Sequence, residues 1–179
     1  MTRRSFRTAA APLALCALAL LAAGCGGGRE YAMPKELCGV PVGEKELSPL
    51  LPDGQKLDVA GDPLVTSANL CGVSVDDDPA VDIQVEKTEK FYDPMDESEA
   101  FRFTNREKSA DLPFEGAGAT GDKHVMITAR CDAPEAGHLI VNIGVGEKAE
   151  KDVDRRRSDL EAFARAFVPS VKKEMGCTA

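Results

Sequence analysis

The stretch HVMITARCDAPEAGHLIVNIGV, residues 124–145, contains two runs in which apolar residues occupy every second position. These residues are Val125, Ile127, Ala129 and Cys131 in the first run and Leu139, Val141, Ile143 and Val145 in the second. A period of two predicts β-strands with one apolar face, and the turn-rich DAPEAGH between them predicts a hairpin. If Cys131 lies opposite Leu139, the other apolar pairs also meet on one face, whereas a slip of one residue would set Ile127 opposite Asn142. We therefore predict an antiparallel hairpin in this register.

The first half of the chain predicts a second pair of strands and two short helices. Apolar residues alternate with polar or small ones over residues 71–75 and 81–85, which predicts a sheet that is apolar on one face and wet on the other. Ser48 and Asp93 are each followed by proline, as at the start of a helix. We expect the second of these helices to reach about Phe103.

The C-terminal segment predicts a longer helix. Its apolar residues recur at helical spacing from Val153 to Val171, Ser158 with Glu161 fits a capping box, and Pro169 is expected to kink or split the helix. Taken together, the elements predict an α+β fold: a single domain in which helices pack on one face of an antiparallel sheet.

The N-terminus predicts a secretory signal peptide. Arg3, Arg4 and Arg7 precede an apolar stretch over residues 9–23 that only Pro12 interrupts. About 15 residues in a helix rise roughly 22 Å, which is shorter than the roughly 30 Å hydrocarbon core of a membrane. A basic segment, a short apolar run and small residues in this order indicate a signal peptide and not a membrane span.

The apolar stretch ends in LAAGC, residues 21–25, which resembles the bacterial lipobox, whose cysteine is lipidated and becomes the new N-terminus. In this sequence Ala22 stands where the lipobox prefers a larger aliphatic residue. TRRSF, residues 2–6, also resembles a twin-arginine export signal, and general export is the alternative. We expect a signal peptide over residues 1–24, lipidated Cys25 and a flexible tether over residues 25–36, and an extracytoplasmic domain over residues 37–179.

A lipid on Cys25 predicts where the protein is found. One acyl chain binds a membrane marginally, whereas two hold a protein there stably. We therefore expect a protein anchored on the outer face of the cell membrane, with this covalent lipid in place of any cofactor.

The charge of the chain argues against nucleic acid and anionic lipid headgroups as partners. The sequence holds 22 basic and 30 acidic residues, for a formal charge of −8. Three of the basic residues and none of the acidic ones lie in residues 1–24, so the remainder has a formal charge of −11. Phosphate binding is supplied mainly by Lys and Arg, and we expect no nucleic-acid partner.

Four cysteines remain once Cys16 of the signal peptide and Cys25 are set aside. They are Cys38, Cys71, Cys131 and Cys177. An even number in an exported domain predicts two disulfides, for which three connectivities are possible. We favour pairing Cys38 with Cys71 and Cys131 with Cys177, because each pair then brackets its own half of the chain. Zinc ligation is disfavoured, since no C-x-x-C pair is present.

Several motifs with possible chemistry have simpler interpretations. GAGATG, residues 116–121, has dinucleotide-binding spacing, but that mechanism needs a preceding strand and a following helix. Because a predicted strand follows instead, we interpret it as a flexible glycine loop. Residues 76–78, three aspartates, lack the spacing of a calcium loop and indicate a solvated acidic turn. Residues 155–157, three arginines, indicate an exposed helix start.

The two histidines do not form a site in the predicted hairpin. His124 and His138 lie at its opposite ends, roughly 23 Å apart at about 3.3 Å per residue, so they cannot share a metal. We interpret both as surface or turn residues. Without a nucleophile elbow for Ser-His-Asp chemistry, we predict no catalytic, cofactor-binding or metal-ligating residues.

The layout resembles the small lipoproteins of unknown function that are abundant in high-GC Gram-positive actinobacteria. The resemblance rests on the lipoprotein signal, the glycine-rich tether, Cys38 before a short leucine-bearing helix, Cys71 opening a strand, Cys131, and a helix ending at Cys177. More distantly, the layout is similar to the extracellular sensor domains of serine/threonine kinases of that lineage. The resemblance implies an α+β domain with two disulfides and no established activity, so it assigns no functional residues.

These observations favour a non-catalytic binding module on the membrane. Its ligand would be an envelope protein or a small molecule of unknown identity. The alternatives are a structural or accessory subunit of a membrane complex and, with less support, a hydrolase.

Overall fold

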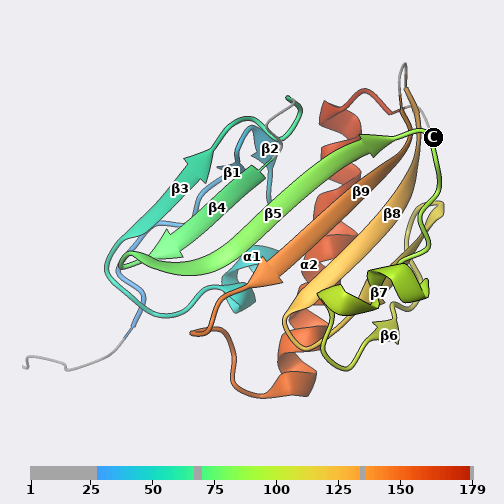
Figure 1. Ribbon diagram of the computed structural model, residues 1–179. Helices are drawn as coiled ribbons and strands as arrows, with labels where there is room; N and C mark the ends of the chain where they lie inside the picture. Colours follow the sequence, from blue (N-terminus) through green and yellow to red (C-terminus); the bar gives the residue numbers. More distant parts are fainter. Residues whose placement is uncertain (1–27, 67–69, 134–135, 178–179) are drawn as a thin grey trace, which may run out of the picture.

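A seven-stranded antiparallel sheet lies at the centre of the molecule in this computed structural model, which describes residues 28–66, 70–133 and 136–177 (Figure 1). The strand order is β3-β4-β5-β9-β8-β7-β6. The bounds are β3 (Leu57–Gly61), β4 (Leu70–Val75), β5 (Asp78–Thr88), β6 (Glu107–Lys108), β7 (Gly116–Thr120), β8 (His124–Ala133) and β9 (Ala136–Val145). A second, small sheet pairs β1 (Glu36–Leu37) with β2 (Val40–Pro41). The predicted α+β class and single domain are confirmed.

The β8–β9 hairpin forms as predicted, but its register differs by two residues. Ala129, and not Cys131, lies opposite Leu139, and Ile127 lies opposite Val141. Alternation determines which face each side chain occupies, and a shift of two residues leaves every apolar residue on the same face. The pairing also shifts between Arg130 and Ala133, an irregularity that the periodic pattern does not encode.

The long helix α2 (Val153–Glu174) packs on one face of the sheet, together with α1 (Glu44–Leu47) and the 3₁₀ helix η1 (Ser48–Leu50). Its buried apolar residues follow the helical period: Leu160, Phe163, Ala164, Phe167, Val168 and Val171. This stripe meets the apolar face of β4, β5, β8 and β9 to form the core.

The ends of α2 differ from the prediction. The N-cap is Asp152, whose carboxylate accepts a hydrogen bond from the Arg155 amide at 3.0 Å, so the capping box at Ser158 is wrong. The helix also continues through Pro169 without splitting. Proline in a helix costs about 3 kcal/mol. Burial of Phe167, Val168 and Val171 around it offsets that cost.

The two short helices also begin elsewhere than predicted. The first is the 3₁₀ helix η1, whose N-cap is Leu47 and whose first residue is Ser48, so it begins one residue before the predicted helix. The second is the 3₁₀ helix η2 (Glu97–Arg102), capped by Asp96 and not by Asp93. The proline-based signal therefore located both short helices, with the start off by one residue at η1 and by three residues at η2.

The face of the sheet opposite α2 is wet over only part of its width. Asp82 and Glu86 of β5 are exposed there, as alternation predicts. Met126, Thr128 and Asn142 of β8 and β9 are buried. Residues 89–106, which connect β5 to β6 and include η2, cover these two strands (Figure 1). The wet face predicted from residues 71–75 and 81–85 therefore does not extend across β8 and β9.

Both disulfides have the pairing that the sequence favoured. Cys38–Cys71 joins the turn between β1 and β2 to β4, and Cys131–Cys177 joins β8 to the chain just after α2. Each bond therefore fixes a peripheral element to the central sheet. Cys16 and Cys25 lie outside the described residues.

The chain before β1 is held against the domain from Arg29 onward, so the predicted tether over residues 25–36 is too long. Arg29 forms a bridge with Gly54, and its guanidinium donates to the Leu51 carbonyl at 2.7 Å. The Tyr31 hydroxyl donates to the Pro52 carbonyl at 2.5 Å. Among the described residues, no helix combines the length and hydropathy needed to cross a membrane.

Candidate functional site

Residues 89–106, here called the covering segment, present a concentration of exposed apolar side chains, including Phe101, the most exposed large apolar residue in the described part of the chain. Four of them are large and lie within eleven residues: Phe91 (49% exposed), Tyr92 (43%), Met95 (36%) and Phe101 (77%). We call these four residues the aromatic ridge. Exposed apolar side chains gathered on one segment often mark an interaction surface, whereas single ones are ordinary.

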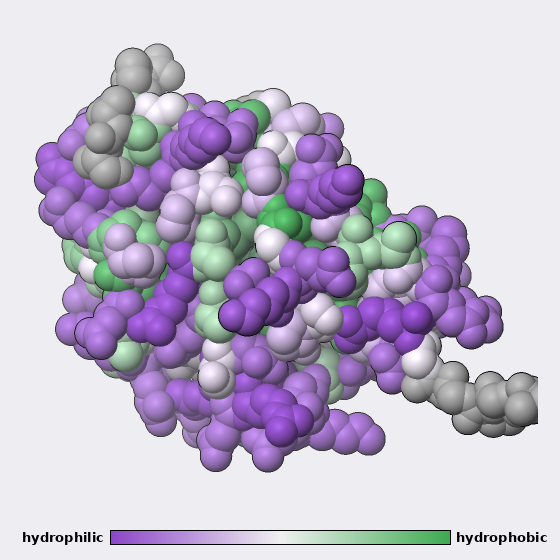
Figure 2. Space-filling model, turned by 180° about the vertical axis from the view of Figure 1, so that it is seen from behind, coloured by the Kyte–Doolittle hydropathy of each residue, from purple (hydrophilic) through white to green (hydrophobic). Residues whose placement is uncertain are grey.

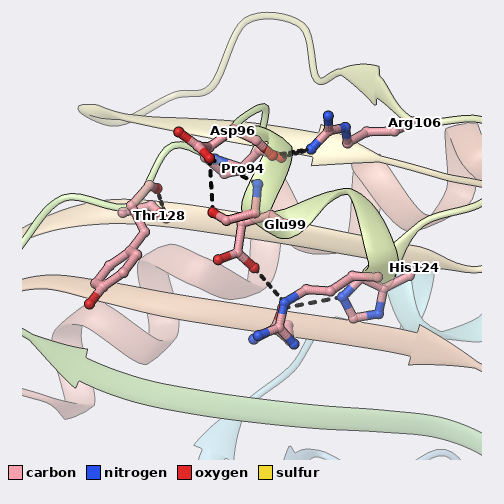
Figure 3. A network of polar contacts seen from close by, with 10 residues as sticks. Pro94, Asp96, Glu99, Arg106, His124 and Thr128 are labelled. Carbon is pink, nitrogen blue, oxygen red and sulfur yellow. Dashed lines mark hydrogen bonds and ion pairs between the residues drawn. The ribbon is translucent and has the colours of Figure 1, made fainter.

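Polar contacts hold the covering segment on the sheet (Figure 3). The Thr128 hydroxyl of β8 donates to the Tyr92 carbonyl at 2.7 Å. Within the covering segment itself, the Arg106 guanidinium donates to the carbonyls of Pro94 at 3.2 Å and Asp96 at 2.6 Å. These hydrogen bonds give partners to backbone carbonyls of an irregular segment, which would otherwise depend on water for them.

Helix η2 has its own local supports. The Asp96 carboxylate accepts hydrogen bonds from the Ser98 amide and hydroxyl, both at 2.9 Å, and these bonds lower the pKa of Asp96. Glu99 and Arg102 form an ion pair at 2.6 Å (Figure 3). The Arg102 guanidinium also lies 4.9 Å from the ring centroid of Phe101. The ridge is therefore displayed on a segment with a defined conformation.

His124 lies under the covering segment and is largely buried, so its interpretation as a surface residue is wrong. Its ring meets Phe103 edge-on at 5.3 Å, and its Nε2 lies 3.2 Å from Asn142 Oδ1. Burial lowers the pKa of His124, while the hydrogen bond to Asn142 opposes that shift. Burial thus favours the neutral form of the imidazole, whose partner is the side-chain amide of Asn142.

His138 lies at the other end of the hairpin, as predicted. Its ring meets Phe91 edge-on at 5.5 Å. His124 pairs with Gly144 and His138 with Arg130 along the two strands, so the two rings are well separated. Among the described residues no cluster of three or more His, Cys, Asp or Glu side chains could hold a metal ion.

The three aspartates lie at the turn of the β4–β5 hairpin, as predicted: Asp76 and Asp77 form the turn, and Asp78 begins β5. Asp76 and Asp77 have positive φ angles of 51° and 66°, which fits a two-residue turn of the type that aspartate tolerates. Asp76 accepts hydrogen bonds from the amides of Gln55 and Lys56, and Asp78 pairs with Lys148. Contacts within the protein therefore engage two of these carboxylates.

The GAGATG stretch is a strand and not the loop that the sequence predicted. Residues 116–120 form β7 and pair with β8. A Cβ at Gly116 would lie 2.4 Å from the Thr128 carbonyl oxygen, and one at Gly118 would lie 2.6 Å from Ile127 Cδ1. These glycines allow close approach of neighbouring chain, and β8 follows where a nucleotide site would need a helix.

The arginine triplet is not the exposed helix start that the sequence predicted. Arg156 is buried, and its guanidinium donates to the carbonyls of Asp122 and Glu150. Arg157 pairs with Glu107 at 2.9 Å and Asp122 at 3.3 Å. Only Arg155 has a mostly exposed side chain. These contacts fasten the start of α2 to the sheet.

Two adjoining hollows lie on the helix side of the molecule, of about 600 and 540 Å³, and share Pro49 and Asp159. Charged residues of both signs line them, including Lys151, Arg155 and Glu150. Burial raises the pKa of Asp159. Hydrophilic residues cover most of this side, with small hydrophobic patches between them (Figure 2). The mixed charge selects no single class of ligand.

Comparison of the chain with known protein families, with curated proteins and with solved structures found no match. The site therefore rests on the geometry described above.

Sequence reasoning missed the aromatic ridge, although a signal was present. Four of the nine Phe and Tyr residues of the chain fall within residues 91–103, between two predicted strands. Such a concentration in a connection, where packing does not require it, could have marked an exposed surface.

Proposed function

We propose that this chain is a lipid-anchored extracytoplasmic lipoprotein that binds another envelope protein, without catalysis, through the aromatic ridge. The observation that carries the proposal is the exposure of four large apolar side chains on a segment held by polar contacts. Aromatic residues, Met and Arg are enriched at protein interfaces. A segment already ordered before binding loses less conformational entropy on binding.

The N-terminal contacts support a position close to the membrane. If Cys25 carries the lipid, residues 26–28 separate it from Arg29, and three extended residues span about 10 Å. The described chain begins on the β3 side of the sheet, whereas the covering segment lies over the other half (Figure 1). A partner can therefore reach the aromatic ridge while the N-terminal end of the chain is anchored to the membrane. Two disulfides also fit an oxidising compartment outside the cytoplasm.

Two other functions are weaker candidates. A structural or accessory subunit would use the same ridge in a permanent complex, and a single stoichiometric partner would distinguish it. A hydrolase would need a reactive base near a nucleophile. His124 pairs with Asn142, and His138 lies at the far end of the hairpin, so neither histidine favours that function.

Crosslinking in intact cells, followed by purification and mass spectrometry, tests the proposal. Phe101→Ser should abolish the crosslink to the partner without unfolding the domain, because this side chain is 77% exposed. Val153→Ser is the matched control, since Val153 is also an exposed apolar residue (41%) but lies at the start of α2. Equal crosslinking by both variants would exclude the ridge as the binding surface.

The anchor is tested separately. Cys25→Ala should move the protein from the membrane fraction to the soluble fraction, because it removes the attachment point of the lipid. Retention of this variant in the membrane fraction would contradict lipidation, whatever the outcome at the ridge.

A further inference from the structure

The two edges of the seven-stranded sheet differ in length and in exposure. At one edge, β6 is only two residues long, and its Glu107 pairs with Arg157. At the other edge lies β3, whose five residues pair, within the described part of the chain, with β4 alone. Val59, Ala60 and Gly61 of this strand are exposed. An exposed edge strand offers unpaired N–H and C=O groups to a further strand.

The pairing of β3 with β4 shows which backbone groups remain available. The Asp76 amide donates to the Lys56 carbonyl at 2.9 Å, so Lys56 faces β4. Along an antiparallel ladder this direction alternates, so every second residue faces away from β4. The residues that face away are Leu57, Val59 and Gly61. No described residue donates to or accepts from their backbone groups on that side.

We propose that two copies of this chain associate through β3, as antiparallel neighbours related by a two-fold axis at Val59. In this register Val59 pairs with Val59 of the second copy, and Leu57 of each copy pairs with Gly61 of the other. Residues opposite each other in a sheet share a face, so both copies keep α2 on the same side of one continuous sheet. The aromatic ridge takes no part, because the covering segment lies over the other half of the sheet (Figure 1).

The charges beside β3 favour this register over its neighbours. Lys56 precedes the strand and Asp62 follows it, so Lys56 of each copy comes opposite Asp62 of the other. A slip of two residues in one direction sets Asp58 opposite Asp58, and a slip in the other direction sets Asp58 opposite Asp62. Opposite charges stabilise a cross-strand pair, whereas like charges destabilise it. Both slipped registers therefore bring carboxylates together, and the register centred on Val59 does not.

The ion pair already present in one copy is compatible with this association. Lys56 Nζ lies 2.7 Å from Asp58 Oδ2 of the same strand, and both side chains are substantially exposed. An ammonium has three donors, so Lys56 can engage Asp62 of the second copy without releasing Asp58. Its long stem also leaves room for the second strand.

A cysteine at the two-fold axis tests the register. Two directly opposite residues whose backbones pair have Cα atoms about 5.5 Å apart, which lies within the range that a disulfide spans. Val59→Cys in the full chain should therefore give a disulfide-linked dimer in intact cells, detected by non-reducing gel electrophoresis. Leu57→Cys is the matched control on the same strand. Its two copies would lie about 13 Å apart along the strands and should not crosslink.

Charge reversal tests the ion pairs. Lys56→Glu or Asp62→Lys alone should weaken dimerisation of the purified full chain at least about tenfold, measured by sedimentation equilibrium, because each substitution acts twice in the dimer. The double variant should return to within about threefold of the unmodified chain, since the two charges are only exchanged. Lys45→Glu, at an exposed lysine of α1, makes the same change in net charge and should alter dimerisation less than about twofold.

Three results would overturn the assignment. A chain that stays monomeric at its highest soluble concentration would exclude the dimer. Equal crosslinking of Val59→Cys and Leu57→Cys would place the contact outside this register. A dimer that neither single charge reversal weakens would contradict the pairing of Lys56 with Asp62. Circular dichroism of each variant establishes that the comparison is made on folded protein.

Discussion

At the scale of single residues, Arg156 shows how a charged side chain becomes part of the core. Its guanidinium spans two backbone carbonyls, of Asp122 and Glu150, from a buried position at the start of α2. Arg156→Met leaves both acceptors without their charged donor, so we expect a loss of about 2–3 kcal/mol in the free energy of unfolding. Urea denaturation measures this loss.

The matched control for Arg156 is its neighbour Arg155. The Arg155 side chain is 71% exposed and makes one ion pair with Glu150 at 3.4 Å. Arg155→Met should change the free energy of unfolding by less than about 0.5 kcal/mol. Similar losses in both variants would contradict the structural role assigned to Arg156.

His124 makes the stability of the protein depend on pH. Burial lowers its pKa in the folded state below the ordinary value of 6.5. Between the folded and unfolded pKa values the unfolded chain binds more protons, so folding stability rises with pH in that window. We expect stability to fall as pH drops below about 6.5, and His124→Gln to remove part of this dependence. NMR titration of the ring tests the cause directly, and a ring pKa above 6.5 would contradict it.

At the scale of elements, the start of α2 distinguishes a structural cap from a sequence motif. Asp152 caps the helix through the Arg155 amide, whereas Ser158 lies exposed in its second turn. Asp152→Ala should lower the free energy of unfolding by about 1 kcal/mol. Ser158→Ala should leave it within about 0.5 kcal/mol, because alanine favours the helix interior. Chemical denaturation of the two variants measures both changes, and the reverse order would restore the capping box.

Strand β7 depends on glycine because its neighbour β8 lies very close to it. A Cβ at Gly116 would overlap the Thr128 carbonyl, which belongs to the backbone and cannot rotate away. Gly116→Ala should therefore lower the free energy of unfolding by about 1–3 kcal/mol. At Gly72 in β4, the nearest atom outside the adjoining residues would be 3.8 Å away. Gly72→Ala is thus the control and should unfold at nearly the same urea concentration as the unmodified protein.

The sequence predicts the strands and helices of this fold better than it predicts the register in which the strands pair. Alternation over residues 124–145 identified β8 and β9 and the face of each side chain, but left the register ambiguous by two residues. It could not show that residues 89–106 would fold back over Met126 and Asn142, since that contact depends on tertiary packing. The burial of Arg156 and His124 was not predicted for the same reason, since no local feature of the sequence distinguishes these two residues from exposed ones.

At the scale of the whole molecule, the two disulfides close separate loops. Cys38–Cys71 spans 33 residues and Cys131–Cys177 spans 46, and the two loops share no residue. Loop-closure entropy gives about 4 kcal/mol for each bond, with a difference of about 0.3 kcal/mol between them. We therefore expect either pair of alanine substitutions to lower the free energy of unfolding by a similar amount, measured with the other bond intact. A difference above about 2 kcal/mol would show that strain or lost packing dominates at one bond.

Loss of both bonds tests whether the core can hold the fold alone. Because the loops do not overlap, their contributions should add to about 7–8 kcal/mol. Domains of this size are typically stable by only about 5–15 kcal/mol in total. The fully reduced chain should therefore unfold at much lower urea concentration, with a measurable unfolded population at 37 °C by circular dichroism. Retention of nearly full stability after reduction would mean that the packing of α2 on the sheet suffices, and would remove the structural reason for an oxidising compartment.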